Sequence, residues 1–401
     1  MGPLAARACS AALALTVAAA SGCGSHALHA TSAPTGAGAG GAPRQPASSA
    51  AATPQQAGSS TAGPPGIADQ ILTVDFVDAL HGWAGGAAGI YGTGDGGRSW
   101  HAEPSAALTV QQLDFVSASD GWALGSAGLL RTQDGGSSWQ PLPAPSGLSG
   151  VDFEGPGAGW AQDRTGGLYA TADGGESWKA VEVPVPVAGM TLLTPEDGWV
   201  VGAGEILRTA DGGQTWQVGA SASGGAAWAG PAWVLSSAGG AGWALLTTGQ
   251  GAASQEAYLL YRTADGGQHW GLVLIGSGSI YPATAPSGQI NWGGPRPSAP
   301  LGPGGYPVGL WAAGAAAGLA VNSPAGGFLQ LTTVGAAGAA AALATIPGDF
   351  LSPQGNTLPM SPVIAFGSPT AGWLAGATPQ TSGLWSSTDG GRTWQVAPAL
   401  P

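Results

Sequence analysis

The octapeptide TQDGGSSW at residues 132–139 occurs in six closely similar copies along the chain. Each copy has Thr or Ser first, an aspartate third, two glycines after it and a tryptophan last. A carboxylate at the third position can accept backbone N–H bonds within a tight turn, and glycines can adopt positive φ there. We therefore expect six β-hairpins whose aspartates have a structural role. These aspartates are Asp95, Asp134, Asp173, Asp211, Asp265 and Asp389.

A Gly-Trp pair precedes each octapeptide. Most of these pairs follow an apolar segment that ends in Phe or Leu six residues before the glycine, as Phe115 does before Gly121. The unit recurs about every 39 residues, has room for four short antiparallel strands, and has the length of a β-propeller blade. The tryptophans of the pairs are Trp83, Trp122, Trp160, Trp199, Trp243 and Trp373.

The interval between Trp243 and Trp373 leaves room for one more unit. Val334 and Ala339 stand where the aspartate and the tryptophan of an octapeptide would be. We predict a degenerate blade at this place. A transmembrane helix over residues 328–346 is the alternative, which the Ala, Gly and Thr content of this segment disfavours because it is poorly hydrophobic.

The predicted fold class is therefore all-β: a seven-bladed β-propeller of four-stranded antiparallel blades, six with the octapeptide and one degenerate. The propeller is expected to span residues 69–401, with an insertion at residues 276–305. Each blade is complete in sequence, so the two ends of the ring need not exchange a strand. The blades are expected at about 69–104, 105–143, 144–184, 185–221, 222–275, 306–346 and 360–401.

The N-terminus resembles a bacterial export signal. Arg7 precedes an apolar segment at residues 8–20, which is too short to span a bilayer. The sequence ASGC that follows, ending at Cys23, resembles a lipobox, in which lipid is attached to the cysteine. We predict a signal peptide over residues 1–22, lipidation of Cys23, and a disordered Ala/Gly/Ser/Pro/Thr tether over residues 23–68. The product would be an extracytoplasmic, cell-membrane lipoprotein, and a secreted protein is the alternative.

Composition excludes several classes of function. The 73 glycines disfavour a mainly helical protein, because each interior glycine destabilises a helix by about 1 kcal/mol. The chain has 10 Lys and Arg against 22 Asp and Glu, which excludes a nucleic-acid-binding protein, since such proteins need several cations to neutralise phosphates. The octapeptides lack the further oxygen ligands that calcium needs, and no histidines have metal-ligand spacing. We expect neither a metal nor a cofactor.

The octapeptide matches the Asp-box, or BNR, pattern. Together with the preceding Phe and Gly-Trp, it resembles the photosystem II stability/assembly factor repeat family over roughly residues 69–270 and 360–398. The resemblance implies a seven-bladed BNR propeller that is exported across a membrane. It does not by itself indicate a photosynthetic role, because the arginine-rich patch expected of those factors is not visible here. Instead, Arg131, Arg208 and Arg262 occupy one equivalent strand position.

Enzymatic alternatives exist among Asp-box propellers. A sialidase is disfavoured because it needs a substrate-binding arginine triad. Once the five repeat arginines and the N-terminal Arg7 and Arg44 are set aside, only Arg164 and Arg296 remain. A glycosidase needs two carboxylates that face each other, about 5–10 Å apart, which we would expect in a cleft on the face opposite the Asp-boxes. The candidate carboxylates outside the octapeptides include Asp163, Glu154, Glu182, Glu196, Asp197, Glu205, Glu256 and Asp349. A carbohydrate-active propeller, either glycosidase or sugar-binding, is therefore the alternative function.

The favoured function is a non-catalytic scaffold that binds an envelope protein or peptide, with the propeller as a monomer. Long loops on rigid scaffolds commonly carry binding residues. The segment that exceeds the blade pattern, residues 271–311, is rich in aromatic residues, which suit a protein or sugar surface. The candidate binding residues are Tyr281, Trp292, Arg296, Tyr306 and Trp311. Trp228, Trp233 and Trp385 also lie outside the repeat pattern, and we expect them in the core.

Overall fold

A computed structural model describes residues 71–104, 109–222, 228, 230–237, 240–252, 255–276, 299–313, 316–323, 327–347, 363–377, 382–397 and 400. These residues belong to one compact unit. Throughout the described ranges the regular elements are β-strands. They form seven antiparallel sheets of four strands, each made from four consecutive strands.

The sheets are the blades, numbered here in chain order. Blade 1 contains β1 (Ile71–Phe76), β2 (Gly82–Gly86), β3 (Gly89–Thr93) and β4 (His101–Ala102). Blade 2 contains β5 (Val110–Phe115), β6 (Gly121–Gly125), β7 (Gly128–Thr132) and β8 (Gln140–Pro141). Blade 3 contains β9 (Leu148–Phe153), β10 (Gly159–Asp163), β11 (Leu168–Thr171) and β12 (Lys179–Val181). Blade 4 contains β13 (Gly189–Leu192), β14 (Gly198–Gly202), β15 (Glu205–Thr209) and β16 (Gln217–Ser221).

The other three blades follow the same order. Blade 5 contains β17 (Ala232–Ser237), β18 (Ala241–Ala252), β19 (Gln255–Thr263) and β20 (Gly271–Ile275). Blade 6 contains β21 (Tyr306–Ala313), β22 (Ala316–Ser323), β23 (Phe328–Val334) and β24 (Ala340–Pro347). Blade 7 contains β25 (Val363–Phe366), β26 (Gly372–Ala377), β27 (Ser382–Ser387) and β28 (Gln395–Val396).

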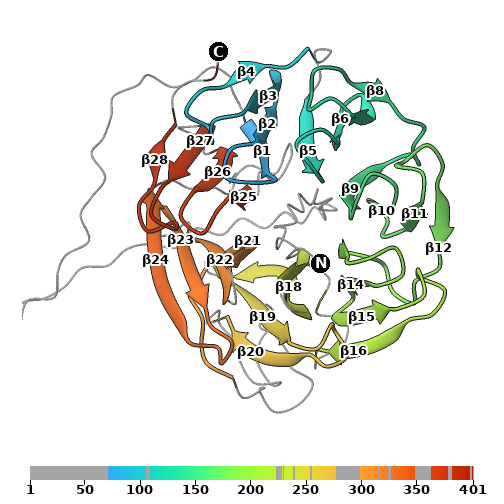
Figure 1. Cartoon of the computed structure of the whole chain (residues 1–401). Helices are drawn as coiled ribbons and strands as arrows, with labels where there is room; N and C mark the ends of the chain where they lie inside the picture. The colour runs from blue at the N-terminus through green and yellow to red at the C-terminus, as the bar shows by residue number, and fades with distance from the viewer. Residues whose placement is uncertain are drawn as a thin grey trace, which may run out of the picture. The chain divides into compact units, whose positions relative to one another are not determined.

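The blades are arranged in a ring, with first strands such as β1, β5 and β9 innermost and fourth strands such as β12, β16 and β24 outermost (Figure 1). The predicted seven-bladed propeller is therefore confirmed, including the degenerate blade. β23 and β24 cover the segment for which a transmembrane helix was the alternative. No helix with the length and apolar character of a membrane span occurs in the described residues.

The spacing between the aromatic residue and the Gly-Trp pair has a steric cause. Phe115 pairs with Gly121 across β5 and β6, and the phenyl ring lies over the glycine. A Cβ atom on Gly121 would lie 2.3 Å from Cδ1 of Phe115, so no larger residue fits beneath the ring. The same contact joins Phe153 to Gly159 in blade 3. The recurring glycine is thus selected by the aromatic ring packed on it.

The tryptophans of the Gly-Trp pairs connect neighbouring blades. Trp122 of blade 2 stacks on Phe153 of blade 3, with ring centroids 3.6 Å apart and planes at 2°. The octapeptide tryptophan Trp178 meets the same phenyl ring edge-on, at 6.0 Å and 73°. Trp83 stacks on Phe115 in the same way between blades 1 and 2. Burial of these large rings supplies apolar stabilisation at the junctions.

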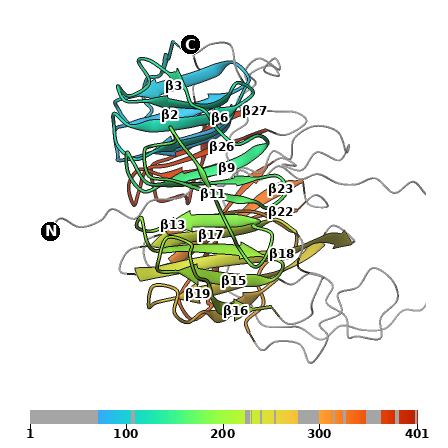
Figure 2. The same ribbon diagram turned by 90° about the vertical axis from the view of Figure 1, so that its right-hand side faces the viewer.

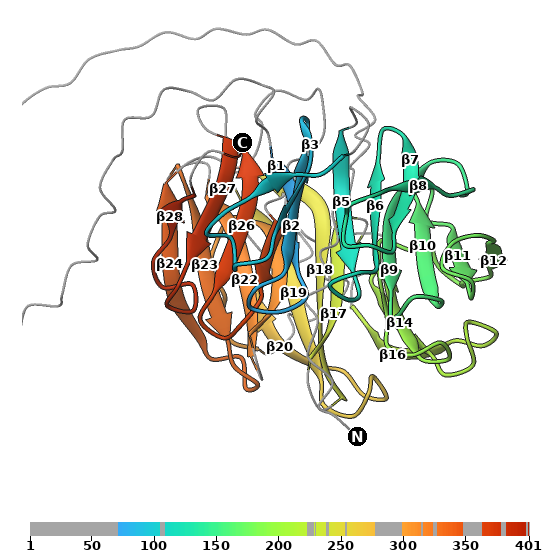
Figure 3. The same cartoon turned by 45° about the horizontal axis from the view of Figure 1, so that its top comes forward.

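Blades 7 and 1 lie side by side (Figure 3). The ring closes between them through the same kind of side-chain contact. Trp373 of blade 7 stacks on Phe76 of blade 1, with centroids 5.5 Å apart and planes at 9°. Trp100 meets Trp373 edge-on at 5.7 Å and 84°. Both blades are built from their own consecutive strands, so the seam is held by side-chain packing and not by a shared sheet.

Blade 5 departs from the pattern in size. β18 has 12 residues and β19 has 9, and the hairpin extends past the strands of blade 4 (Figure 2). Trp233 in β17 and Trp385 in β27 are buried, as expected. Trp228 is also buried, as expected, although it precedes β17 and lies outside the strand.

Candidate functional site

Each octapeptide forms a turn closed by its own side chains. In blade 3, Oδ1 of Asp173 accepts the backbone N–H of Ser177 at 2.9 Å, and Oδ2 accepts the Ser177 hydroxyl. The Thr171 hydroxyl donates to Oδ1 at 2.7 Å, while its oxygen accepts the N–H of Gly175 at 2.9 Å. The blade 7 turn repeats these bonds around Asp389. Both carboxylate oxygens are thus engaged inside the turn, which is a structural arrangement.

These bonds favour the charged carboxylate. Donation by the side chains of Ser99, Ser177, Thr215 and His269, and then mostly by backbone N–H groups, lowers the pKa of four box aspartates from 3.8 to about 2. These aspartates are Asp95, Asp173, Asp211 and Asp265.

We expect the propeller to lose stability as the pH falls from about 4 to about 2. The folded-state pKa of these aspartates is depressed, so their contribution is complete above the unfolded pKa of 3.8 and is lost towards the folded value of about 2. The melting temperature measured at intervals from pH 6 to pH 2 tests this. Replacing the four aspartates with asparagine should flatten the profile below pH 4, and an unchanged slope would contradict the expectation.

The sequence-predicted binding residues do not converge in the described part of the chain. Tyr281, Trp292 and Arg296 lie outside the described residues, as does Cys23. Tyr306 begins β21 and is partly exposed.

Trp311 must be corrected from a binding residue to a core residue. It is only 1 % exposed and stacks on Phe366 of blade 7, with centroids 6.3 Å apart. It also pairs with Gly318, as Phe115 pairs with Gly121, so it occupies the position of the repeat phenylalanine. The repeat phenylalanine could not be recognised in the sequence of the degenerate blade, because a tryptophan stands in its place.

Several carboxylates considered for a glycosidase are engaged in turns. Asp163 accepts hydroxyl bonds from Thr165 at 2.7 Å and from Tyr169 at 3.0 Å. Asp197 forms an ion pair with Arg208 at 2.6 Å. Asp349 lies outside the described residues. Within the described ranges no group of three or more His, Cys, Asp and Glu side chains could hold a metal ion.

A pocket at the C-terminal ends of the first strands gathers Glu154, already among the candidate carboxylates, with three aspartates that the sequence motifs did not single out. It is lined by Asp75, Asp114, Asp152 and Glu154, together with neighbouring residues of blades 1 to 5. The pocket lies at the Asp-box end of the ring. The β1–β2 turn and the blade 1 octapeptide meet at this end, because the N–H of Gly96 donates to the carbonyl of Leu80. The expected cleft was on the opposite face, so the acidic residues gather at the other end of the ring.

Three of these carboxylates connect successive blades. Oδ2 of Asp75 accepts the N–H of Phe115, and Oδ2 of Asp114 accepts that of Phe153, both at 2.7 Å. Asp152 does the same for Leu192 of blade 4 at 2.7 Å. Each aspartate directly precedes the phenylalanine of its blade, so the recurring Asp-Phe dipeptide was the signal that could have identified them.

Three arginines pair with the tryptophans of their own blades on the neighbouring strand. Arg131, Arg208 and Arg262 pair in register with Trp122, Trp199 and Trp243, which places them in one equivalent position. The guanidinium carbon of Arg131 lies 5.1 Å from the Trp122 ring centroid, and that of Arg262 lies 5.7 Å from the Trp243 centroid.

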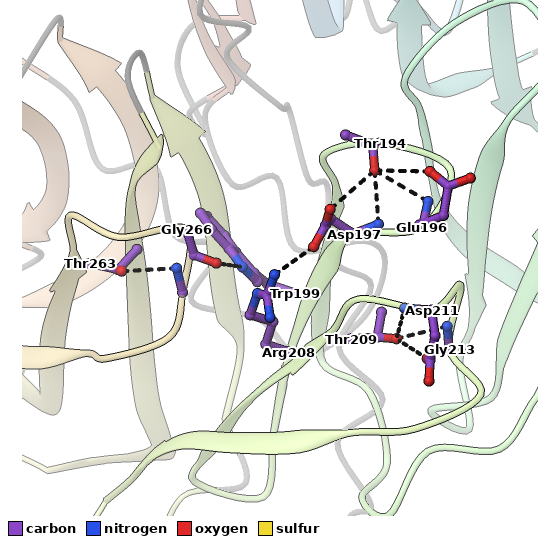
Figure 4. Close-up of polar contacts among 11 residues, drawn as sticks. Thr194, Glu196, Asp197, Trp199, Arg208, Thr209, Asp211, Gly213, Thr263 and Gly266 are labelled. Atoms are coloured by element: carbon purple, nitrogen blue, oxygen red, sulfur yellow. Dashed lines mark hydrogen bonds and ion pairs between the residues drawn. The ribbon is translucent and has the colours of Figure 1, made fainter.

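In two of these pairs, both the arginine and the tryptophan donate to acceptors of the protein. Arg208 binds Asp197, and Nε1 of Trp199 donates to the carbonyl of Gly266 in the next octapeptide at 3.2 Å (Figure 4). Arg131 lies 3.7 Å from Asp120 and donates to the carbonyl of a blade 3 turn residue at 2.8 Å. These arginines therefore hold turns and blades together.

Comparison with known proteins agrees with this architecture. The family model of the photosynthesis system II assembly factor YCF48 matches residues 65–185. A solved structure of YCF48 bound to a D1 peptide has 18 % identity and a TM-score of 0.50, covering 82 % of this chain and 95 % of that chain. YCF48 from Cyanidioschyzon merolae has 16 % identity and a TM-score of 0.51, covering 81 % and 97 %.

Solved structures of other proteins match with lower TM-scores. An ancestral GH74 enzyme has 16 % identity and a TM-score of 0.46, covering 84 % of this chain and 46 % of that chain. No curated protein matches the sequence. The octapeptides, the seven blades and the YCF48 matches together identify the chain as a BNR-type β-propeller that resembles the photosystem II assembly factor.

Proposed function

We propose that this protein is a non-catalytic propeller scaffold that binds a protein or peptide partner at the cell envelope. The main support is the role of its carboxylates. Those of the octapeptide turns, and Asp75, Asp114 and Asp152 of the acidic pocket, accept hydrogen bonds from the protein itself. Such groups hold the ring rigid, and a rigid surface lowers the entropy cost of binding a partner. The resembled YCF48 is seen with a D1 peptide, which supports a partner of this kind.

The acidic pocket does not favour catalysis over scaffolding. A glycosidase pair needs one carboxyl group free to donate a proton and another free to attack or to activate water. Asp75 and Asp114 instead each engage an oxygen with an N–H group of the following blade. We propose no photosynthetic role, because the shared feature is the repeat and its fold.

Selection from a random peptide display library on the purified full chain tests the binding function. We expect one family of related peptides to be enriched and to bind with one-to-one stoichiometry in calorimetry. Incubation of the same protein with a panel of polysaccharides, followed by an assay for new reducing ends, covers the carbohydrate-active alternative. Glycan turnover without any enriched peptide family would overturn the proposal.

We further propose that a lipid on Cys23 tethers the propeller to the membrane from the extracytoplasmic side. Cys23→Ser should move the protein from the membrane pellet to the soluble fraction, because the acyl chains that anchor it would be lost. Labelled fatty acid incorporation and fractionation measure this. Cys9→Ser is the matched control and should leave both unchanged, since Cys9 lies within the expected signal peptide. Unlabelled, soluble wild-type protein would instead indicate secretion.

A further inference from the structure

The Arg262–Trp243 pair of blade 5 differs from its counterparts in blades 2 and 4. In those blades a carboxylate lies beside the arginine: Asp120 beside Arg131 and Asp197 beside Arg208. Asp197 directly precedes Gly198, which pairs with Thr209 in the neighbouring strand. This register identifies the equivalent residue in every other blade.

In blade 5 the equivalent residue is alanine. Gly242 pairs with Thr263 as Gly198 pairs with Thr209, so Ala241 stands where Asp197 stands in blade 4. Arg262 keeps its position over the indole of Trp243. Within the described part of the chain, no carboxylate forms an ion pair with it.

Trp243 has also lost its acceptor. The indole N–H groups of Trp83, Trp122 and Trp199 each donate to a glycine carbonyl in the octapeptide of the following blade. The blade after Trp243 is the degenerate one, in which Val334 replaces the aspartate and packs in the same cluster as Trp243. Trp243 is 0 % exposed, and its Nε1 has no hydrogen-bond partner among the described residues.

The covering parts of the following blade are reduced as well. The first and second strands of blade 4 are separated by residues 193–197, whereas those of blade 6 are separated only by residues 314–315. The octapeptide turn is replaced by a short turn in which Gly335 donates its N–H to the carbonyl of Ala339. The bounds of the described strands thus leave two residues for the first turn of blade 6, which also has no octapeptide turn, whereas blade 3 contacts the Arg131–Trp122 pair through both turns.

We propose that Arg262, whose guanidinium lies over the ring of Trp243, binds a carboxylate of the partner. The site is at the Asp-box end of the junction between blades 5 and 6. A partly buried guanidinium without a counter-charge is unfavourable, and its planar fork matches a carboxylate in bidentate geometry. In blades 2 and 4 the protein supplies that carboxylate, and in blade 5 the partner does. This inference rests on the proposed peptide-binding function. The partner's carboxylate is either its C-terminus or an Asp or Glu side chain.

Titration of the ¹⁵N-labelled full chain with small probes tests the site directly. The probes are N-acetyl-Ala-Gly with a free C-terminus, N-acetyl-Glu-Ala-amide and the uncharged N-acetyl-Ala-Gly-amide. We expect saturable shifts of the Arg262 Nε–H and Trp243 indole N–H signals, assigned with Arg262→Gln and Trp243→Phe, for a charged probe only. The two charged probes distinguish a terminal from a side-chain carboxylate.

Matched variants make the test decisive. Arg262→Gln should weaken binding of the charged probe at least about tenfold, in line with loss of a charge-assisted bond. Ala241→Asp should also abolish binding, because it supplies the internal partner present in blade 4. Arg208→Gln, at the same position in blade 4, should leave binding unchanged. If Ala241→Asp does not fold, Arg262→Gln alone decides the question.

Two results would overturn the inference: no saturable shift with either charged probe, or equal affinity in Arg262→Gln. Failure of the wider function is a separate observation. If library-selected peptides bind wild type and Arg262→Gln equally well, the scaffold function stands and the carboxylate site is wrong. If charged probes bind at Arg262 while the library yields no peptide, the site stands and the peptide-binding function is wrong.

Discussion

Replacing Trp122 with alanine should lower the free energy of unfolding by about 3–5 kcal/mol, the usual cost of removing a large aromatic residue from a core. Trp122 is 0 % exposed and stacks on Phe153 of the next blade. Its Nε1 donates to the carbonyl of Gly174 at 2.9 Å. The substitution therefore removes apolar burial and an interblade hydrogen bond together. Since domains are stable by about 5–15 kcal/mol, this loss would leave the ring close to unfolding.

Denaturant unfolding of the purified chain measures the effect. Trp122→Phe should cost less, about 1–3 kcal/mol, because a ring can still stack while the Gly174 carbonyl loses its donor. Val396→Ala, at a side chain that is 70 % exposed, should stay within about 0.5 kcal/mol. A Trp122→Ala loss as small as that of Val396→Ala would show that the interblade stack does not hold the ring.

Replacing Gly97 with alanine should open the seam between blades 1 and 7. Gly97 has φ of +76°, and a Cβ atom there would lie 2.1 Å from Cζ2 of Trp373. The strained backbone costs about 1 kcal/mol and the overpacking a further 1–3 kcal/mol, so we expect a loss of about 2–4 kcal/mol. Trp373 cannot move freely, because it also stacks on Phe76.

Gly128→Ala separates the two contributions. Gly128 has φ of +89°, but no atom lies within 4 Å of the position its Cβ would take. This variant should lose only the backbone cost of about 1 kcal/mol. Comparison of the two unfolding curves, with near-ultraviolet circular dichroism to follow the tryptophans, measures the packing at the seam. Equal losses in Gly97→Ala and Gly128→Ala would mean that the seam does not depend on Trp373.

The blade was predictable because its determinants are short-range. The octapeptide closes through bonds between residues two to four positions apart, as between Asp173 and Ser177. The Phe-to-Gly spacing follows from pairing of adjacent strands, as between Phe115 and Gly121. Even the degenerate blade could be located, because the strand pattern survives the loss of its box.

The site was less predictable, because its residues are defined by contacts between blades. No sequence motif singles out Asp75, yet it accepts the N–H of Phe115, forty residues away. Trp311 looked like an insertion aromatic, yet it fills the core position of a phenylalanine. Arg262 was recognised as a repeat position, but its lack of a counter-charge appears only when the blades are compared in register.

By itself the sequence determined that the chain builds four-stranded Asp-box blades and that seven of them form a propeller. Local turn bonds and periodic strand pairing encode those features within each unit, so they can be read along the chain. Only the tertiary structure decided which blade each tryptophan stacks on, which aspartates bridge neighbours, and which arginine lacks an internal partner. The physical reason is that these contacts join equivalent units about 40 residues apart, as from Asp75 to Phe115, and a repeat pattern does not specify how one unit meets the next.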